Sequence, residues 1–283
     1  MCTNNPFIGL PASLALVALL LSISVQGYAV PININISQMT ATATKSEVSV
    51  DVNPSNPNNL VVISHADLLR TMEIFYSNDA GQTWTGVSLG NALDGRAVGA
   101  LRFDPTVSFD ADGNVYVAYG VNDGTTTALI VAKSTDGGQT YSATTVADTP
   151  NTNIAGNDKW ILATGPDPVD ASKQNVYVAW TQNTGTPVST TEQKIVLSAS
   201  KDGGATFSAP VKINDTTKNG QLIAEPVVGK DGKLYVSWQD IAFGGTVQVD
   251  VSTDAGATWG TDNTVTGWNP AFNDAFSELI PAQ

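Results

Sequence analysis

The sequence is poor in basic residues and in charge overall. Its 283 residues contain 13 Lys and Arg against 26 Asp and Glu, a formal net charge of −13, and charged residues make up only 14% of the chain. Nucleic-acid binding needs clustered Lys and Arg that replace counterions on phosphates, so that class of function is excluded. Coiled coils and helix bundles are excluded too, because their compositions are rich in Ala, Glu, Lys and Leu. A hydrophobic content of 42% argues against disorder.

Cysteine and histidine are almost absent. The single cysteine, Cys2, lies in a segment that we expect to be removed, so the mature chain would have no disulfide and no thiolate metal site. The single histidine, His65, makes by itself neither a Ser-His-Asp triad nor a zinc site. We expect His65 in a loop or at a sheet edge, and we expect no bound metal from these residue types.

Only one long hydrophobic run is present, at the N-terminus. Residues 10–25 carry no charge, and the small residues Gly27 and Ala29 stand three positions and one position before a cut after Ala29. This layout predicts a signal peptide over residues 1–29. It also predicts a protein that is secreted, periplasmic or at the cell surface, with no membrane span after cleavage. The run is slightly short for a spanning helix of about 20 residues, and an uncleaved N-terminal anchor is the alternative.

A pattern of eight residues, Ser-x-Asp-x-Gly-x-Thr-aromatic, occurs four times after this segment. Its Asp, Gly and aromatic positions are Asp79, Gly81 and Trp84, then Asp136, Gly138 and Tyr141, then Asp202, Gly204 and Phe207, and finally Asp254, Gly256 and Trp259. The four Asp residues are 57, 66 and 52 residues apart, a period that indicates a propeller or a repeat array. An Asp carboxylate can accept N–H bonds from the residues after it, and Gly allows positive φ. We therefore interpret these residues as structural turn residues.

Strand-like segments precede every copy of the motif. They are rich in β-branched and aromatic residues and are bounded by Gly, Asn and Asp, as in residues 115–119 and 128–132. Each unit has four antiparallel strands, which is the content of one propeller blade. The predicted blades cover residues 47–90, 103–147, 158–213 and 223–266. We expect residues 30–283 to form an all-β propeller that is interrupted early in a fifth blade, at residues 270–283.

The repeated motif resembles the Asp box, also called the bacterial neuraminidase repeat. The resemblance extends over about residues 47–268 and implies the sialidase-type β-propeller, which has six blades in complete members of that superfamily. Sialidases of this kind bind the substrate carboxylate with three arginines, and they use an Asp as acid/base and a Tyr activated by a Glu as nucleophile. The resemblance makes the three arginines of this chain, Arg70, Arg96 and Arg102, candidates for substrate binding. The family's arginine-isoleucine-proline motif does not occur in the sequence.

Three carboxylates stand just before the first strand of predicted blades. They are Asp104, Asp158 and Glu225, and strand alternation places them near the axis, at the mouth opposite the repeated motif. As catalytic candidates, Asp104 or Asp158 would serve as general acid/base with Glu225 as its partner. In a second interpretation they end the crossings between blades and bind local backbone. In a third they hold Ca²⁺, which favours oxygen ligands.

Aromatic residues recur at matching positions of the predicted second strands, and we expect them to pack between blades. They are Tyr116, Tyr119, Tyr177, Trp180, Tyr235 and Trp238. Trp160 and Trp268 fall outside this register, and either could provide a surface on which a sugar stacks.

Three classes of function are consistent with these residues. One is an exported glycoside hydrolase, by resemblance an exo-α-sialidase, that acts on a glycan or glycoconjugate. The second is a non-catalytic propeller, secreted or at the cell surface, that binds glycan or protein. The third is a structural module of a larger envelope protein.

Overall fold

The computed structural model describes residues 36, 45–66, 71–89, 91–97, 99–150, 157–183, 193–215, 220–241 and 245–267. The predicted signal peptide, the predicted start of a fifth blade, Arg70 and Trp268 lie outside these residues. All described strands belong to one compact unit, Asn35–Gln283.

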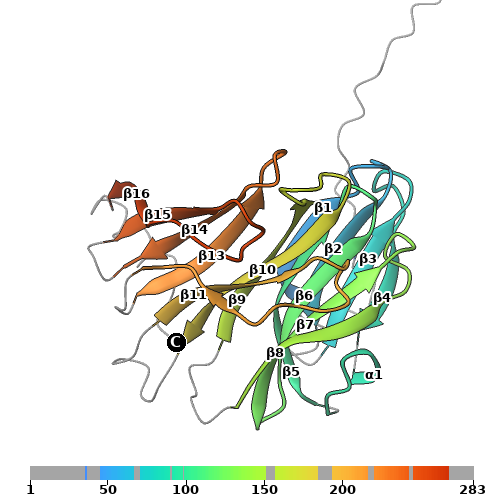
Figure 1. Ribbon diagram of the computed structural model, residues 1–283. Coiled ribbons are helices and arrows are strands. Elements are labelled where there is room, and N and C mark those ends of the chain that lie inside the picture. The colour runs from blue at the N-terminus through green and yellow to red at the C-terminus, as the bar shows by residue number, and fades with distance from the viewer. Residues whose placement is uncertain are drawn as a thin grey trace, which may run out of the picture. The chain divides into compact units, whose positions relative to one another are not determined.

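The described residues form four antiparallel sheets of four strands each, with the strands of every sheet side by side in chain order (Figure 1). The strands are β1 (Lys45–Val52), β2 (Leu60–Ala66), β3 (Thr71–Ser77) and β4 (Thr85–Leu89); β5 (Leu101–Phe109), β6 (Val115–Asn122), β7 (Thr126–Ser134) and β8 (Ser142–Pro150); β9 (Asn157–Pro166), β10 (Gln174–Asn183), β11 (Gln193–Ser200) and β12 (Val211–Lys212); β13 (Gln221–Val228), β14 (Leu234–Asp240), β15 (Thr246–Ser252) and β16 (Asn263–Gly267). A single helical turn, α1 (Asn91–Asp94), precedes β5. The prediction of an all-β fold built from four-stranded antiparallel blades is confirmed.

Neighbouring sheets pack face to face through three hydrophobic clusters, one for each pair of successive sheets. The aromatic residues of the second strands supply much of this packing, with Tyr119 in the first cluster, Tyr116 and Trp180 in the second, and Tyr177 and Trp238 in the third. Because β6 is covered on both faces, its residues are buried almost without interruption, which explains why it reads as a continuous apolar run.

The sixth of these aromatic residues, Tyr235, does not follow the expectation of burial between blades. Its surface is 38% exposed, because β14 is covered on one face only and its residues alternate between buried and partly or fully exposed positions.

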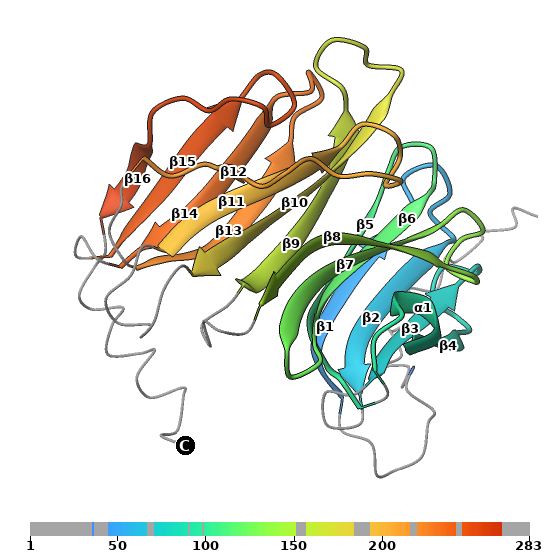
Figure 2. The same cartoon turned by 60° about the horizontal axis from the view of Figure 1, so that its bottom comes forward.

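The first strand of each sheet contacts the first strand of the next, in the order β1, β5, β9 and β13. Figure 2 shows the sheets succeeding one another from the blue first sheet to the red fourth sheet. Side chains join the backbones of these strands. Asp51 Oδ2 of β1 accepts from the Phe109 amide of β5 at 2.7 Å, and Thr164 Oγ1 of β9 donates to the Phe109 carbonyl at 2.5 Å. The sheets are therefore linked by directional bonds as well as by apolar packing.

The repeated motif forms the turn between the third and fourth strands of every sheet. In the first copy, Asp79 accepts from Thr83 N at 2.8 Å, from Thr83 Oγ1 at 2.6 Å and from Ser77 Oγ at 2.8 Å. Gly81 takes the positive φ of 83° that the turn requires. The Ser, Asp and Thr contacts recur in the other three copies. Each motif is thus a closed turn whose polar groups bond to one another.

Candidate functional site

The first strands of the four sheets, β1, β5, β9 and β13, contact one another, and we call them the innermost strands. Each innermost strand contains a β-bulge at which a residue other than glycine has positive φ. The four residues are Glu47 (52°), Asp104 (51°), Lys159 (55°) and Ile223 (55°). The pairing register of each strand shifts at that point. Such a backbone conformation costs about 1–3 kcal/mol and occurs often at functional sites. A bulge also re-aims side chains, and here it does so at the matching position of four neighbouring strands.

A hollow of about 340 Å³ is lined by these bulges. Every innermost strand contributes its bulge residue and the second residue after it, which is Ser49, Thr106, Ile161 or Glu225. The innermost strands begin at Leu101 and Gln221, so Asp104 and Glu225 lie within them and not before them as the sequence suggested. The prolines that follow both residues fit these strands because proline is tolerated at bulges.

Asp104 is at the centre of a chain of contacts between three sheets. Its side chain is only 8% exposed. It accepts from Lys159 Nζ at 2.6 Å and from Lys159 N at 3.2 Å. The Asp104 amide in turn donates to Glu47 Oε2 at 2.8 Å. The carboxylate is therefore held in a fixed orientation by a cation and an amide.

Asp158 lies beside this carboxylate, next to Lys159 in β9. The residue is exposed to solvent, but its carboxyl group is partly desolvated by the neighbouring residues. Burial raises its pKa from 3.8 to about 6, and a hydrogen bond with Asp104 and the charge of Asp104 add to the shift. Lys159 opposes the shift. Two carboxyl groups this close share a proton, so Asp158 can carry a proton near neutral pH.

Glu225 enters the same hollow from β13. Burial raises the pKa of its carboxyl group above the ordinary value. The structure thus brings the three carboxylates selected from the sequence to one place, since Asp104 and Glu225 line the hollow and Asp158 bonds to Asp104.

His65 also belongs to this region, which sequence reasoning missed. It lies within β2 and is 6% exposed, whereas we expected a loop or edge residue. Its Nε2 is in hydrogen-bond contact with Ser46 Oγ, and its Nδ1 lies 3.1 Å from Glu47 Oε2. Ser46 and Glu47 are adjacent in β1, and a regular strand would direct them to opposite faces. The β-bulge in β1 lets both side chains reach the same imidazole, and no pattern in the sequence predicted that bulge.

Trp160 does not offer a free surface for a sugar. It is 1% exposed and packs in the second hydrophobic cluster, with its ring centroid 5.6 Å from that of Phe103. Trp160 is one of the residues that line the hollow, but it belongs to the hydrophobic core.

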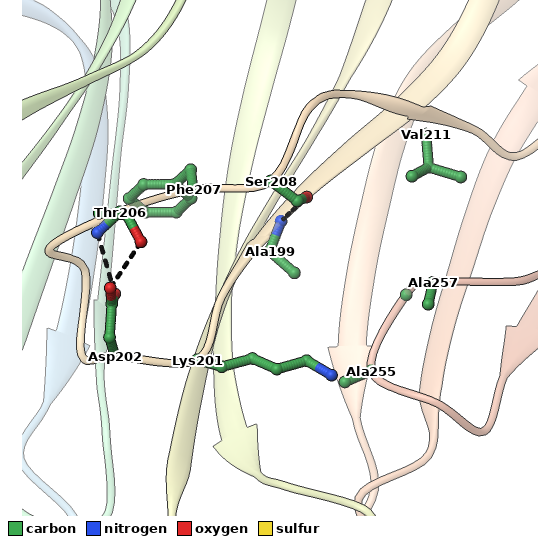
Figure 3. Close-up of a pocket in the computed structure, with 10 residues that line it drawn as sticks. Ala199, Lys201, Asp202, Thr206, Phe207, Ser208, Val211, Ala255 and Ala257 are labelled. Atoms are coloured by element: carbon green, nitrogen blue, oxygen red, sulfur yellow. Dashed lines mark hydrogen bonds between the residues drawn. The ribbon is translucent and has the colours of Figure 1, made fainter.

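A second hollow, of about 590 Å³, lies between the third and fourth copies of the motif. Figure 3 shows Lys201 extending across it toward Ala255, with Phe207 and Val211 on its wall. Although this hollow is larger, Asp202 is the only carboxylate among its lining residues, and Thr206 and Ser200 already bond to it. The smaller hollow with its group of carboxylates is therefore the better candidate for chemistry.

Among the residues that the structure describes, no three or more His, Cys, Asp or Glu side chains are arranged to hold a metal ion. Within the same residues, no helix has the length and apolar character needed to cross a membrane.

Comparison with known proteins agrees with the fold and the motif. The family model described as the BNR/Asp-box repeat matches residues 75–85. A Penicillium chrysogenum α-L-arabinanase complexed with arabinobiose aligns with 78% of this chain and 67% of its own, at 13% identity and a TM-score of 0.56. A GH93 α-L-arabinofuranosidase of Fusarium graminearum with arabinobiose aligns with 78% of this chain and 66% of its own, at 14% identity and a TM-score of 0.58.

A bacterial sialidase has the same fold. The NanB sialidase of Streptococcus pneumoniae, as its K499G mutant, aligns with 79% of this chain and 52% of its own, at 11% identity and a TM-score of 0.53. This chain has the sialidase-like β-propeller fold with Asp-box repeats. It spans about two thirds of the length of the two arabinan-related enzymes and about half that of the sialidase. The sequence matches none of the curated proteins with which it was compared.

The two arginines that the structure describes in this sialidase-like propeller, Arg96 and Arg102, have polar partners in α1 and the second sheet. Arg102 is 1% exposed and binds Asp94 through two bonds of 2.8 and 3.0 Å. Arg96 Nη1 lies 3.1 Å from Thr126 Oγ1 and 3.5 Å from Asp123 Oδ2. Neither of the two is among the residues that line the hollow. The cation that the structure brings to the carboxylates is Lys159.

Proposed function

We propose that this sialidase-like propeller acts on glycans and hydrolyses a glycosidic bond in the hollow formed by the four bulges. The observation that carries the proposal is the bonded Asp104–Asp158 pair, of which Asp104 lines the same hollow as Glu225. The fold is that of glycoside hydrolases, among them two that were determined with arabinobiose.

The chemistry follows from the different environments of the carboxylates. Asp158, whose pKa burial and Asp104 raise to about 6, would protonate the leaving glycosidic oxygen as general acid. Glu225, entering from another sheet, would act as the second carboxylate, either as base for water or as nucleophile. Asp104 stays oriented by Lys159 and keeps the proton on Asp158.

The substrate that fits this hollow best is a neutral glycan. Carboxylates outnumber cations among the charged groups, with Glu47, Asp104 and Glu225 against Lys159. An anionic sugar such as a sialoside would meet like charge there. An exo-α-sialidase activity, implied by the family resemblance, is therefore the alternative. We also propose export, on the sequence of residues 1–29.

The test is hydrolysis of a 4-nitrophenyl α-L-arabinofuranoside, an arabinan oligosaccharide and a fluorogenic α-sialoside by the same preparation. We expect cleavage of at least one neutral substrate and a loss of roughly 10²-fold or more in kcat for Asp158→Asn. Asp231→Asn, in the exposed turn between β13 and β14, is the matched control and should retain the wild-type rate. Equal rates in Asp158→Asn and wild type would overturn the acid role. Binding of the oligosaccharide without turnover would favour the non-catalytic propeller.

The pH profile gives an independent check. Since the acid must be protonated, kcat/KM should fall as pH rises through about 6. Asp104→Asn removes a charge and a hydrogen bond that raise the pKa of Asp158, so this limb should move to lower pH. A limb that stays at the wild-type pH in Asp104→Asn would show that the pair does not control the reaction.

A further inference from the structure

We propose that Ser46, His65 and Glu47 form a second catalytic site, one that hydrolyses carboxylic esters through a serine nucleophile. His65 Nε2 is in hydrogen-bond contact with Ser46 Oγ, and His65 Nδ1 lies 3.1 Å from Glu47 Oε2. This is the order of contacts that activates a serine: hydroxyl to imidazole, and imidazole to carboxylate. The glycosidic reaction proposed above uses none of these three side chains as acid, base or nucleophile.

The bulge in β1 creates the arrangement. Ser46 pairs directly with His65 across the two strands, and the register then shifts before Ser49. Side chains of a regular strand alternate between its two faces. Glu47 breaks this alternation because its φ is 52°, so its side chain approaches the same imidazole as that of its neighbour Ser46. The strained backbone of Glu47 places its carboxylate beside the second ring nitrogen of His65. A backbone outlier of this kind is a physical reason to infer a function.

The contacts also fix the state of the imidazole. Glu47 Oε2 accepts from the Asp104 amide at 2.8 Å, so it acts as an acceptor toward His65 as well. Nδ1 then carries the proton and Nε2 is free to accept from the Ser46 hydroxyl. His65 is buried while Ser46 and Glu47 reach solvent. The base is thus held rigidly, and the nucleophile remains open to a substrate.

The reaction balances with water as the only co-reactant. Ser46 Oγ attacks the ester carbonyl as its proton passes to His65 Nε2. The tetrahedral intermediate expels the alcohol, which takes that proton, and leaves an acyl group on Ser46. Water, deprotonated by His65, attacks the acyl-enzyme, and the carboxylic acid leaves as Ser46 regains its proton. Glu47 acts as a positioning residue that orients the imidazole and stabilises its charged form.

The substrate class follows from where the site lies. Glu47 also lines the hollow between the bulges, so a sugar bound there would present its hydroxyl groups, or acyl esters on them, to Ser46. We infer that the substrate is a small O-acyl ester of a glycan. The choice of a sugar as the alcohol depends on the proposed function, whereas ester hydrolysis itself does not.

The first experiment uses 4-nitrophenyl acetate with the full chain. We expect hydrolysis with an initial burst of 4-nitrophenol, and a fall of roughly 10²-fold or more in Ser46→Ala. Ser88→Ala, an exposed serine in β4, is the control and should keep the wild-type rate. Glu47→Gln can still accept from the Asp104 amide, and it should lower kcat with little change in KM. Equal rates in wild type and Ser46→Ala would overturn the proposal.

The second experiment does not depend on turnover. A fluorophosphonate probe should add covalently to Ser46, and peptide mass spectrometry should locate the adduct there and not on Ser88. Absence of an adduct on Ser46 would overturn the proposal. Asp158→Asn should lower glycoside cleavage by roughly 10²-fold or more and leave both the burst and the adduct intact. Failure of the glycosidase proposal is therefore distinguishable from failure of this one.

Discussion

Each Asp box concentrates several hydrogen-bond donors on one carboxylate. In the third copy, Thr206 donates to Asp202 from its hydroxyl at 2.5 Å and from its amide at 2.9 Å, and Ser200 adds a bond of 2.7 Å. These bonds lower the pKa of Asp202 from 3.8 to about 2, with the Thr206 hydroxyl as the largest cause. The turn is thus stabilised by the ionised form of its Asp.

This shift predicts how stability depends on pH. The folded pKa lies below the unfolded value, so the contribution of Asp202 is complete above about pH 4 and is lost as pH falls toward 2. Asp202→Asn should lower the free energy of unfolding at pH 6 and should flatten its decline between pH 4 and 2. Urea unfolding at several pH values measures both effects. An unchanged pH dependence in Asp202→Asn would show that the turn does not rely on the charge.

A second prediction concerns the buried ion pair of Arg102. Its partner Asp94 has a side chain with 0% exposure, so removing the guanidinium would leave an uncompensated buried carboxylate. We expect Arg102→Ala to destabilise the fold by about 3–5 kcal/mol. The double variant Arg102→Met with Asp94→Leu should recover most of that loss, since it removes both charges. A loss of glycan binding with unchanged stability would instead support the substrate-binding role that the family resemblance suggested for Arg102.

At the scale of elements, the strands are specified by two kinds of sequence pattern. The buried strands read as apolar runs, and the turns carry Asp, Gly and Asn at the required positions, so four units could be predicted. The bulges could not, because Glu47, Asp104, Lys159 and Ile223 are unlike in chemistry and none is a glycine. Their left-handed conformation is imposed by packing between strands, which no local pattern records.

The close packing of successive sheets gives a prediction at this scale. A Cβ atom added to Gly120 of β6 would come within 2.1 Å of Trp160 Cζ2 in β9. Gly120→Ala should therefore overpack the contact between the second and third sheets and destabilise the fold by about 1–3 kcal/mol. Gly86→Ala in β4, whose added Cβ would meet Phe75 at an ordinary 3.4 Å, is the control and should change the unfolding midpoint little. Equal midpoints for both variants would contradict the packing argument.

At the scale of the whole molecule, two groups of apolar side chains are in contact with solvent, one on β1 of the first sheet and one on β13 of the fourth, and we call them the apolar faces of these strands. The first sheet exposes Val48 (65%) and Val50 (59%), and the fourth exposes Val227 (57%). In contrast, Tyr177 is fully buried at the position in the third sheet that matches the exposed Tyr235. Apolar faces of this kind favour association.

These faces predict concentration-dependent association. Val50→Thr combined with Val227→Thr keeps the shape and β-branching of the side chains while adding a hydroxyl group to each face. We expect weaker self-association by sedimentation velocity than in wild type, with an unfolding midpoint close to the wild-type value. Replacing the exposed Thr85 and Thr261 with Ser serves as the control. Association that is unaffected by the valine changes would show that these faces do not contact other copies.

The sequence is enough to predict the four-bladed pattern and the chemistry of the Asp boxes, because each box is complete within eight consecutive residues. It also singled out Asp104, Asp158 and Glu225. Which of these groups act together depends on how the strands pack in the folded chain. The contact between Asp104 and Glu47 joins residues 57 positions apart, and that between Lys159 and Asp104 joins residues 55 apart. Such pairs depend on how successive sheets pack and where their strands bulge, and these are properties of the folded chain and not of any local segment.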